Sequence, residues 1–561
     1  MESFRIWKLL PADPAAGSLA QACGIAPLIA QILLNRGVRR AEDARAFLRP
    51  TLSTLSDPFR LPQMAEAVAA IRQAVRAGRL VLVFGDSDVD GISAATLVSE
   101  AITRLGGRVA VRLSNRLADG YGFPPSRIAR VARSGIGLVI LVDCGTNQAD
   151  EIEALSRQGI PTVVLDHHVP SGRAARPAAL VNPHVGDGAG FGLCSTGLAV
   201  KLIQAISPGD RDALERSLDV AALGTLADYS PLAGDNRVLV TEGLARLLES
   251  RRPGLRHLCD AVGISSAQPD QVLKRLVPRL NACGRLGGAR PVWRALTATS
   301  EADATRASVL LEEAHATTKS LHRQVMTDAY SQVSRLHFRD HQVLVVGRRG
   351  WPAGLMGPLA SALVQQYARP VVALALDERV GVGSGRAPEP FNLFEALRSC
   401  ERMLLRYGGH ARACGLTLAS GDFEAFRAQI NQYAQAAPLP DHGRRTLLID
   451  ADARVSDLSH ALVEQMDALK PFGIGNPKPT VLLRGVTIRA GEGGGAWIED
   501  GGYRLRIRGK LPPGESTGAY DVVVAPTLIN AEPAATVCDL RARPGDESSR
   551  RAGESLPAVS A

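Results

Sequence analysis

Three aspartates, Asp86, Asp88 and Asp90, alternate in the short segment GDSDVDG, at the point where a hydrophobic run ends. Carboxylates this close repel one another, and each resists being taken out of water. A bound cation or plain solvent must compensate that repulsion. A single D-x-D at a strand end is usually a helix cap or a solvated turn, so the segment alone does not decide between the two.

Two further hydrophobic runs end in residues that can bind metals. LVILVD ends in Asp143, and PTVVLD ends in Asp166, which is followed by His167 and His168. Apolar runs that alternate with amphipathic segments predict a parallel sheet covered on both faces. The predicted strands are 79–86, 108–115, 137–145 and 161–168, with helices at 94–107 and 148–159. Ligands bind at the carboxyl edge of such a sheet, where these side chains are expected to meet.

The types of donor at this edge indicate which metal they would bind. Asp228 ends a further apolar segment, AALGTLAD, that could close over the same edge. Oxygen and imidazole donors without thiolate favour Mg²⁺ or Mn²⁺ over a structural zinc. Several shared carboxylates suit two ions roughly 3.5–4 Å apart, which activate water and stabilise a phosphoryl transition state. Taken singly, Asp143 could merely cap a helix and the His-His pair could be incidental, but their joint arrival favours a metal site.

Composition narrows the class of partner and the cellular setting. The 561 residues carry a formal net charge of +9, and their 65 basic residues are seven lysines and 58 arginines. Guanidinium groups bind phosphate oxygens in a bidentate manner, so an arginine-rich chain suits a phosphate-rich partner. Codon bias in a GC-rich genome would give the same composition. The eight cysteines form no C-x-x-C pair and indicate neither a zinc ribbon nor a disulfide framework. Apolar stretches fall short of the ~20 residues of a membrane span, and no secretion signal is present, so we expect a cytoplasmic protein without membrane contact.

The pattern of helices, strands and linkers divides the chain into several expected units. Their expected bounds are 1–60 for an N-terminal helical segment and linker, 61–255 for the first α/β domain, 256–335 for connecting helices, 336–435 for a second α/β domain, 440–540 for a small all-β barrel and 541–561 for a tail. The tail lacks apolar periodicity and is expected to be disordered.

Several longer motifs carry a resemblance to a known family. GDSDVDGISA, LVDCG and LDHH, in this order, resemble the DHH phosphoesterase superfamily. Within it, the segments SNRLADGYG, ALGTLADYSPLAGDNR, PRLNACGRL, GSGRAP, YGGHARACG and PFGIGNPKP are similar to motifs of the RecJ exonuclease family. The resemblance implies an α/β fold, with a parallel-sheet DHH domain and a DHHA1 domain around a cleft, followed by a C-terminal barrel like an OB-fold.

The same resemblance implies an activity and partners. It implies a 5′→3′ exonuclease that hydrolyses single-stranded DNA to 5′-mononucleotides with two Mn²⁺ or Mg²⁺ ions, in DNA recombination and repair. The implied partners are single-stranded DNA with a 5′ phosphate, a single-strand-binding protein and a helicase, and the chain itself is expected to be monomeric. A DHH enzyme of small substrates, such as a pyrophosphatase, oligoribonucleotidase or cyclic-dinucleotide phosphodiesterase, is one alternative, which the separate barrel argues against. A catalytically silent DNA-binding or scaffold protein is the other, and the complete set of acids argues against it.

The resemblance also assigns roles to residues around the acids. The positions that match metal ligands are Asp88, Asp90, Asp143, His167 and Asp228. Asp86 matches an acidic position that either binds a metal or orients a ligand. Asp166 is expected to hold the neighbouring imidazole in place, and His168 is expected to contact the scissile phosphate or to shuttle a proton.

Further matches concern the substrate. Arg116, Ser384 and Arg386 resemble a pocket for the 5′ phosphate, in which a glycine-flanked loop offers N–H groups and two guanidiniums neutralise the dianion. The residues expected to contact DNA elsewhere are Arg279, Asn281, Arg285 and His410. Simpler alternatives are a tight turn for GSGR, a helix-ending glycine pair for YGGH and solvated surface arginines.

Aromatic residues and two departures from the family pattern bear on substrate preference. Tyr121, Phe123 and Tyr407 either stack on bases or pack in a core. Ser87 stands where the family motif commonly has an aromatic residue, and Pro352 stands where a histidine is frequent. Neither departure touches an expected metal ligand.

Overall fold

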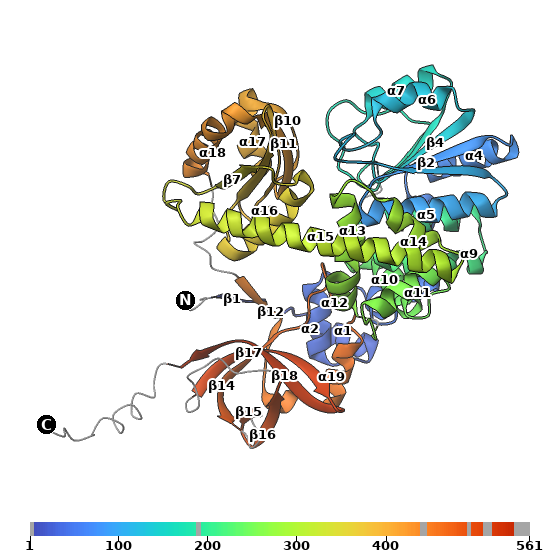
Figure 1. Cartoon of the computed structure of the whole chain (residues 1–561). Helices are drawn as coiled ribbons and strands as arrows, with labels where there is room; N and C mark the ends of the chain where they lie inside the picture. Colours follow the sequence, from blue (N-terminus) through green and yellow to red (C-terminus); the bar gives the residue numbers. More distant parts are fainter. Residues whose placement is uncertain are drawn as a thin grey trace. The chain divides into compact units, whose positions relative to one another are not determined.

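Two compact units make up the chain. The computed structural model describes residues 5–186, 192–266, 268–437, 446–490, 495–508 and 519–543. One unit joins residues 1–51 to residues 445–561, and the other comprises residues 52–444 (Figure 1). Apart from its first three residues, the predicted disordered tail, 541–561, lies outside the described residues.

A five-stranded parallel sheet forms the frame of the larger unit. Its strands are, in spatial order, β3 (Arg108–Leu113), β2 (Leu80–Gly85), β4 (Ile136–Val142), β5 (Thr162–Leu165) and β6 (Ala179–Val181). The first four were predicted, and the three-residue β6 was not. Continuous runs of Val, Leu and Ile bury both faces of the central strands, as a covered parallel sheet requires.

Helices cover both faces of this sheet (Figure 1). One face packs on α4 (Met64–Arg76), α5 (Val89–Arg104) and α8 (Ser195–Ile206), and the other on α6 (Ile128–Ala132) and α7 (Ala149–Arg157). Helix α5 begins five residues before the predicted helix, because Asp88 caps it and accepts a hydrogen bond from the Gly91 N–H at 3.1 Å. Asp90 therefore lies in the first turn of α5.

A helical region continues the same hydrophobic core. Its helices are α9 (Arg211–Ala227), α10 (Gly234–Leu247), α11 (Pro253–Ala261), α12 (Pro269–Gln271), α13 (Val277–Arg285), α14 (Arg290–Thr297) and the 33-residue α15 (Glu301–Val333). Leu258, Leu280 and Leu311 belong to one core cluster with the sheet residues. The segment predicted as connecting helices, 256–335, thus packs on the first α/β domain over much of its length.

The second α/β domain has a mixed five-stranded sheet. Its strands are, in spatial order, β10 (Leu404–His410), β11 (Ala413–Ala419), β9 (Val380–Arg386), β8 (Val371–Leu376) and β7 (Leu344–Arg349), and its helices are α16 (Met356–Tyr367), α17 (Leu393–Arg398) and α18 (Phe423–Ala436). GSGR lies inside β9, which pairs with strands on both sides, so it is neither a loop nor a tight turn. YGGH lies in β10 and does not end a helix.

The smaller unit holds a closed barrel of five strands. Its strands are β14 (Val481–Ala490), β15 (Ala496–Asp500), β16 (Tyr503–Ile507), β18 (Glu532–Ala542) and β17 (Ala519–Ile529), which pairs back with β14. The short β13 (Ala451–Ala453) adds to β14. The all-β prediction for 440–540 is wrong in one respect, because α19 (His460–Asp467) interrupts the strands and packs in the barrel core.

The first and the last described segments of the chain both belong to this unit. Helices α1 (Ala16–Cys23), α2 (Pro27–Asn35) and α3 (Ala41–Leu48) share one core with the barrel, and β1 (Ile6–Leu9) pairs with β12 (Thr446–Ile449). A buried ion pair joins Arg36 to Asp450 at 3.1 Å. Of the helices in the described ranges, none is by itself long and apolar enough to cross a membrane; α1 and α2 pass that test only as a pair bent by 113°.

Candidate metal centre

Acids and imidazoles from five elements of the larger unit converge at one place. Asp86 and Asp88 follow β2, Asp143 follows β4 and His167 follows β5, while Asp90 comes from the first turn of α5 and Asp228 caps the C-terminus of α9. Their ligand atoms form three overlapping groups, each within 4.8 Å: Asp86, Asp88 and Asp143; Asp90, His167 and Asp228; and Asp143, His167 and His168. The convergence expected at the carboxyl edge of the sheet is therefore present.

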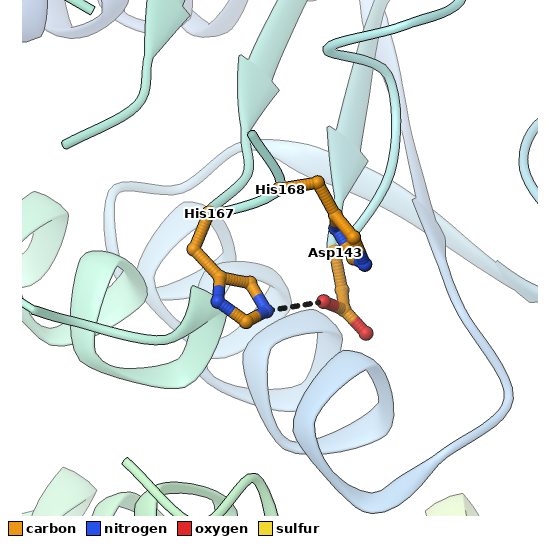
Figure 2. A group of neighbouring side chains, drawn as sticks. All are labelled: Asp143, His167 and His168. Atoms are coloured by element: carbon orange, nitrogen blue, oxygen red, sulfur yellow. Dashed lines mark ion pairs between the residues drawn. The ribbon is translucent and has the colours of Figure 1, made fainter. Parts of the chain in front are cut away.

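His167 lies between the groups. Its Nε2 atom is 3.3 Å from Asp143 Oδ1 and 3.8 Å from both Asp90 Oδ2 and Asp228 Oδ1. Figure 2 shows the His167 ring directed at the Asp143 carboxylate, and the centroids of the His167 and His168 rings lie 4.9 Å apart. One imidazole nitrogen thus faces three carboxylates at once.

Backbone groups hold Asp90 in position. Its two carboxylate oxygens accept hydrogen bonds from the N–H groups of Ser195 (2.9 Å) and Thr196 (2.8 Å), at the N-terminus of α8. A helix N-terminus favours negative charge, so α8 stabilises the ionised carboxylate. The Ser195 hydroxyl also donates to Asp143 Oδ1 at 3.2 Å. Sequence analysis missed both residues, although a Cys-Ser-Thr run opening an apolar helix was a usable signal.

Arg116 lies among the acids. The buried Asp86 carboxylate accepts hydrogen bonds from the Ser114 hydroxyl and from the Arg116 guanidinium, which also reaches Asp88 Oδ2 at 2.9 Å. Gly91 lets the first turn of α5 pack closely on the Asp86 backbone, because a Cβ there would lie 2.7 Å from the Asp86 carbonyl oxygen. The structure therefore places Arg116 on two acids, where it offsets part of their charge.

Asp166 organises the other side of the site. Its Oδ1 accepts a hydrogen bond from the His168 Nδ1–H at 2.7 Å and from the His167 N–H at 2.9 Å, and its Oδ2 accepts one from the Thr146 N–H at 3.0 Å. The imidazole that the Asp166 carboxylate holds is thus that of His168. The Tyr121 hydroxyl lies 3.0 Å from His168 Nδ1 and donates to the Asp143 carbonyl at 3.0 Å.

Burial and mutual repulsion shift the pKa values of this cluster in different directions. Burial, then the charges of Asp88, Asp90 and Asp86, raises the pKa of Asp143 well above its ordinary value. Burial and the nearby Asp90 raise the pKa of Asp228 to about 7. Burial would lower the pKa of His167, but Asp228 and Asp90 raise it overall.

Two acids have pKa values below their ordinary range. Burial would raise the pKa of Asp88, but the Arg116 guanidinium and the Gly91 N–H lower it overall. Burial would likewise raise the pKa of Asp166, but the hydrogen bond and charge of His168 hold it well down. The cluster thus keeps some carboxylates ionised while others lack a compensating charge.

The donor set fits divalent cations. Asp86, Asp90 and Asp143 are buried, and among the described contacts Asp86 is the one of the three that pairs with a guanidinium, that of Arg116. Buried carboxylates need a cation or a proton, and oxygen and imidazole donors at this spacing suit Mn²⁺ or Mg²⁺. The residues that the structure brings together are those that the sequence predicted as ligands.

Ser384 and Arg386 lie on β9 and face the first turn of α16. A Cβ built on Gly357 would lie 3.4 Å from Arg386 Nη2 and 3.7 Å from Ser384 Oγ, so glycine keeps this space open. Burial lowers the pKa of Arg386, and no carboxylate compensates it among the described residues. The space therefore combines a helix N-terminus, a hydroxyl and a half-buried cation, which suits an anion.

The other predicted DNA contacts have different surroundings. Arg279 pairs with Glu312 of α15, and this engages its guanidinium within the protein. Arg285, at the end of α13, is half-buried and has no acidic partner in the described residues. Asn281 lies between them on the same helix, and His410 is exposed at the end of β10. Of the stacking candidates, Phe123 is a core residue in edge contact with Phe84, and Tyr407 packs against Phe394.

A cavity of about 630 Å³ opens away from the acids, at the C-terminal end of α5. Arg252 in its wall binds Glu100 at 2.7 Å and Asp219 at 3.3 Å. Because these charges are neutralised within the wall, we assign this cavity no ligand.

Three family models match the chain, and each falls on a domain described above. The DHH family N-terminal domain matches residues 80–225, the DHHA1 domain matches residues 340–436 and the RecJ OB domain matches residues 449–495. A parallel-sheet DHH domain carrying the acidic cluster, followed by a DHHA1 domain, defines the class of DHH proteins.

Individual relatives narrow the class. The chain is 33% identical over 487 residues to the single-stranded-DNA-specific exonuclease RecJ of Bacillus subtilis, covering 85% of this chain and 61% of that protein. It is 34% identical over 496 residues to the RecJ of Thermus thermophilus, covering 87% of this chain and 71% of the relative. The chain belongs to the RecJ family. It is similar to the crystal structure of Thermus thermophilus RecJ in complex with Mn²⁺, with a TM-score of 0.81 and 29% identity over 97% of this chain and 81% of that one.

Proposed function

We propose that this chain is a metal-dependent exonuclease that removes nucleotides from the 5′ end of single-stranded DNA by two-metal-ion catalysis. The observation that carries the proposal is the convergence of five aspartates and His167, from separate elements, on one site. The relatives named above are single-stranded-DNA-specific exonucleases, and one of them is similar in fold with Mn²⁺ bound. The chain spans 61% of the length of the Bacillus subtilis relative, so the activity of the whole relative is part of the proposal.

The acids and histidines of the cluster have different proposed roles. Asp88, Asp90, Asp143, His167 and Asp228 would hold the ions, and Asp86 would orient Arg116 or act as a further ligand. Bound Mn²⁺ or Mg²⁺ supplies an activated water and neutralises charge that develops on the phosphoryl group. Asp166 fixes the His168 ring through Nδ1, which leaves Nε2 to face the scissile phosphate.

The space around Arg386 accounts for the proposed polarity. Ser384, Arg386 and the first turn of α16 would bind the terminal 5′ phosphate, and the distance from there to the acids would measure off one nucleotide. We keep Arg116 as a proposed ligand of the same phosphate; in the structure its guanidinium contacts Asp86 and Asp88.

Replacing Arg386 by alanine is expected to lower the preference for a 5′ phosphate over a 5′ hydroxyl by about tenfold or more. A hydrogen bond to a charged group contributes about 1.5–3 kcal/mol, which corresponds to that factor. The measurement is kcat/KM on matched oligonucleotides with either terminus. Arg379→Ala, an exposed arginine next to the other end of β9, is the matched control and should keep the preference. If Arg386→Ala keeps the wild-type ratio of kcat/KM for the two termini, Arg386 does not bind the 5′ phosphate.

Digestion of end-labelled DNA tests the proposed function as a whole. Single- and double-stranded DNA, labelled at each end in turn, is incubated with Mn²⁺, Mg²⁺ or a chelator. We expect the 5′ label to be released first, as a mononucleotide, from single strands and only with metal. First release of the 3′ label, or faster hydrolysis of dinucleotides than of long strands, would favour a different enzyme.

The proposal extends to cellular role and assembly. We place the chain in DNA recombination and repair, with a helicase that supplies single strands and a single-strand-binding protein that covers them. The resemblance of the motifs and the similarity to the RecJ relatives support this role. Sedimentation of the purified chain, alone and with a single-strand-binding protein, checks the oligomeric state and this interaction. We expect the chain alone to sediment as a monomer.

A further inference from the structure

Tyr229, the residue after Asp228, has an unfavourable backbone conformation. Helix α9 ends with the Tyr229 N–H bonded to the Leu226 carbonyl and the Ser230 N–H bonded to the Thr225 carbonyl. This is a Schellman motif, whose left-handed position is usually glycine. Here that position holds tyrosine, at a φ of +59°. For a bulky residue such a φ is a strained exception, and strain of this kind tends to occur at functional sites.

Packing of the Tyr229 side chain within the protein does not offset this strain. The residue is 60% exposed, and within the described ranges its hydroxyl has no hydrogen-bond partner. A glycine, asparagine or small residue would end α9 at lower cost. The aromatic ring is therefore better explained by something that it contacts outside the chain.

The neighbours of Tyr229 indicate what that contact is. Asp228 Oδ1 lies 3.8 Å from His167 Nε2, so the Tyr229 backbone is one residue from the candidate metal centre. Helix α13 packs on the segment that carries the acids, because a Cβ built on Gly284 would lie 2.6 Å from the Ser87 carbonyl oxygen, and Arg285 is the next residue. An exposed ring and a half-buried arginine without an acidic partner in the described residues thus both lie next to the candidate metal centre.

Both residues come from elements with fixed positions. Leu226 at the end of α9 and Cys283 in α13 belong to one buried core cluster, so Tyr229 and Arg285 are held by the same packing. An exposed aromatic ring and an unpaired guanidinium at one site match the two parts of a nucleotide, because the ring stacks on a base and the guanidinium binds a phosphate.

We propose that Tyr229 is a specificity-determining residue that stacks on a nucleobase flanking the scissile phosphate, with Arg285 on the adjoining backbone phosphate. The inference rests on the proposed function for its substrate class. The base contact that it adds is separate from the expected metal and phosphate ligands. Stacking on an aromatic side chain is worth about 1–3 kcal/mol per base, or roughly a five- to 150-fold change in affinity.

Binding of single-stranded DNA by Tyr229→Gly, measured with Ca²⁺ in place of the catalytic ion, tests the proposal. We expect the Kd of Tyr229→Gly for a 5′-phosphorylated strand to rise about tenfold, while its melting temperature does not fall, because glycine relieves the strain. An abasic site at the first or second nucleotide should weaken binding by the wild-type chain and by Tyr229→Phe, but not by Tyr229→Gly. The binding readout does not require cleavage, so a failure of the proposed exonuclease activity is detected separately.

Ala368→Gly is the matched control, since Ala368 also has a positive φ, of +50°, at the end of α16. It should relieve strain without changing the Kd for DNA. The proposal is overturned if Tyr229→Gly binds DNA as tightly as the wild-type chain. It is also overturned if Tyr229→Gly stays sensitive to an abasic site at both positions, or if its Kd rises only together with a lower melting temperature.

Discussion

Replacing Asp143 by asparagine is expected to reduce kcat on single-stranded DNA by at least about a thousandfold. Asp143 belongs to two of the three ligand groups, and its Oδ1 lies 3.3 Å from His167 Nε2. Loss of one shared carboxylate would remove several kcal/mol of transition-state stabilisation, and each 1.36 kcal/mol is a factor of ten in rate. The measurement is the release of mononucleotides at saturating DNA and Mn²⁺.

The fold of Asp143→Asn is expected to survive this change. Burial and four neighbouring acids raise the pKa of Asp143, so in metal-free protein its charge is unfavourable and the amide should not lower the melting temperature. Asp270→Asn, at an exposed acid on α12, is the matched control and should keep full activity. Near-normal turnover by Asp143→Asn would remove Asp143 from the catalytic site.

Metal-free protein is expected to lose stability as the pH rises from about 4 to about 7, and Mn²⁺ is expected to restore it. The pKa of Asp228 is about 7 in the folded chain and near 3.8 in the unfolded chain, so over this range the folded chain holds a proton that the unfolded chain releases. The raised pKa of His167 acts in the same direction, because its protonated form is favoured in the folded chain. For each such proton, the free energy of unfolding falls by up to about 1.4 kcal/mol per pH unit.

Metal binding should act most strongly at high pH, since the ligands must be deprotonated. Mn²⁺ at about a thousand times its Kd adds about 4 kcal/mol to the free energy of unfolding. The measurement is the melting temperature from pH 5 to pH 8, with chelator or with Mn²⁺. Asp228→Asn should flatten the slope of the chelated protein. A stability that rises with pH in chelator, or no stabilisation by Mn²⁺ at pH 8, would contradict the assignment of these ligands.

Much of the site could be predicted from the sequence because its residues follow buried strands. A parallel sheet brings the carboxyl ends of its strands together, so Asp86, Asp88, Asp143 and His167 could be placed at one edge from the apolar runs alone. The α/β order of the first and second domains followed from the same alternation. The apolar segment that ends in Asp228 indicated that this acid could close over the same edge, and the family resemblance assigned it as a ligand; its position depends on how α9 folds back on the sheet.

Other features depended on contacts between distant segments, which no local pattern encodes. The N–H groups of Ser195 and Thr196 hold Asp90 from 105 and 106 residues away, and Arg116, which the family resemblance assigns to the 5′ phosphate, also contacts Asp86. GSGR has the composition of a turn but lies in β9, because pairing with strands on both sides overrides the preference of glycine. The shared core of α1–α3 and the barrel likewise joins segments separated by most of the chain.

Anomalous diffraction from crystals grown with Mn²⁺ would locate the ions themselves. We expect two Mn²⁺ peaks roughly 3.5–4 Å apart, bound by Asp88, Asp90, Asp143, His167 and Asp228. One of the two peaks should vanish in Asp228→Asn. Mn²⁺ bound elsewhere, or no peak among these side chains at millimolar metal, would contradict a two-metal nuclease site.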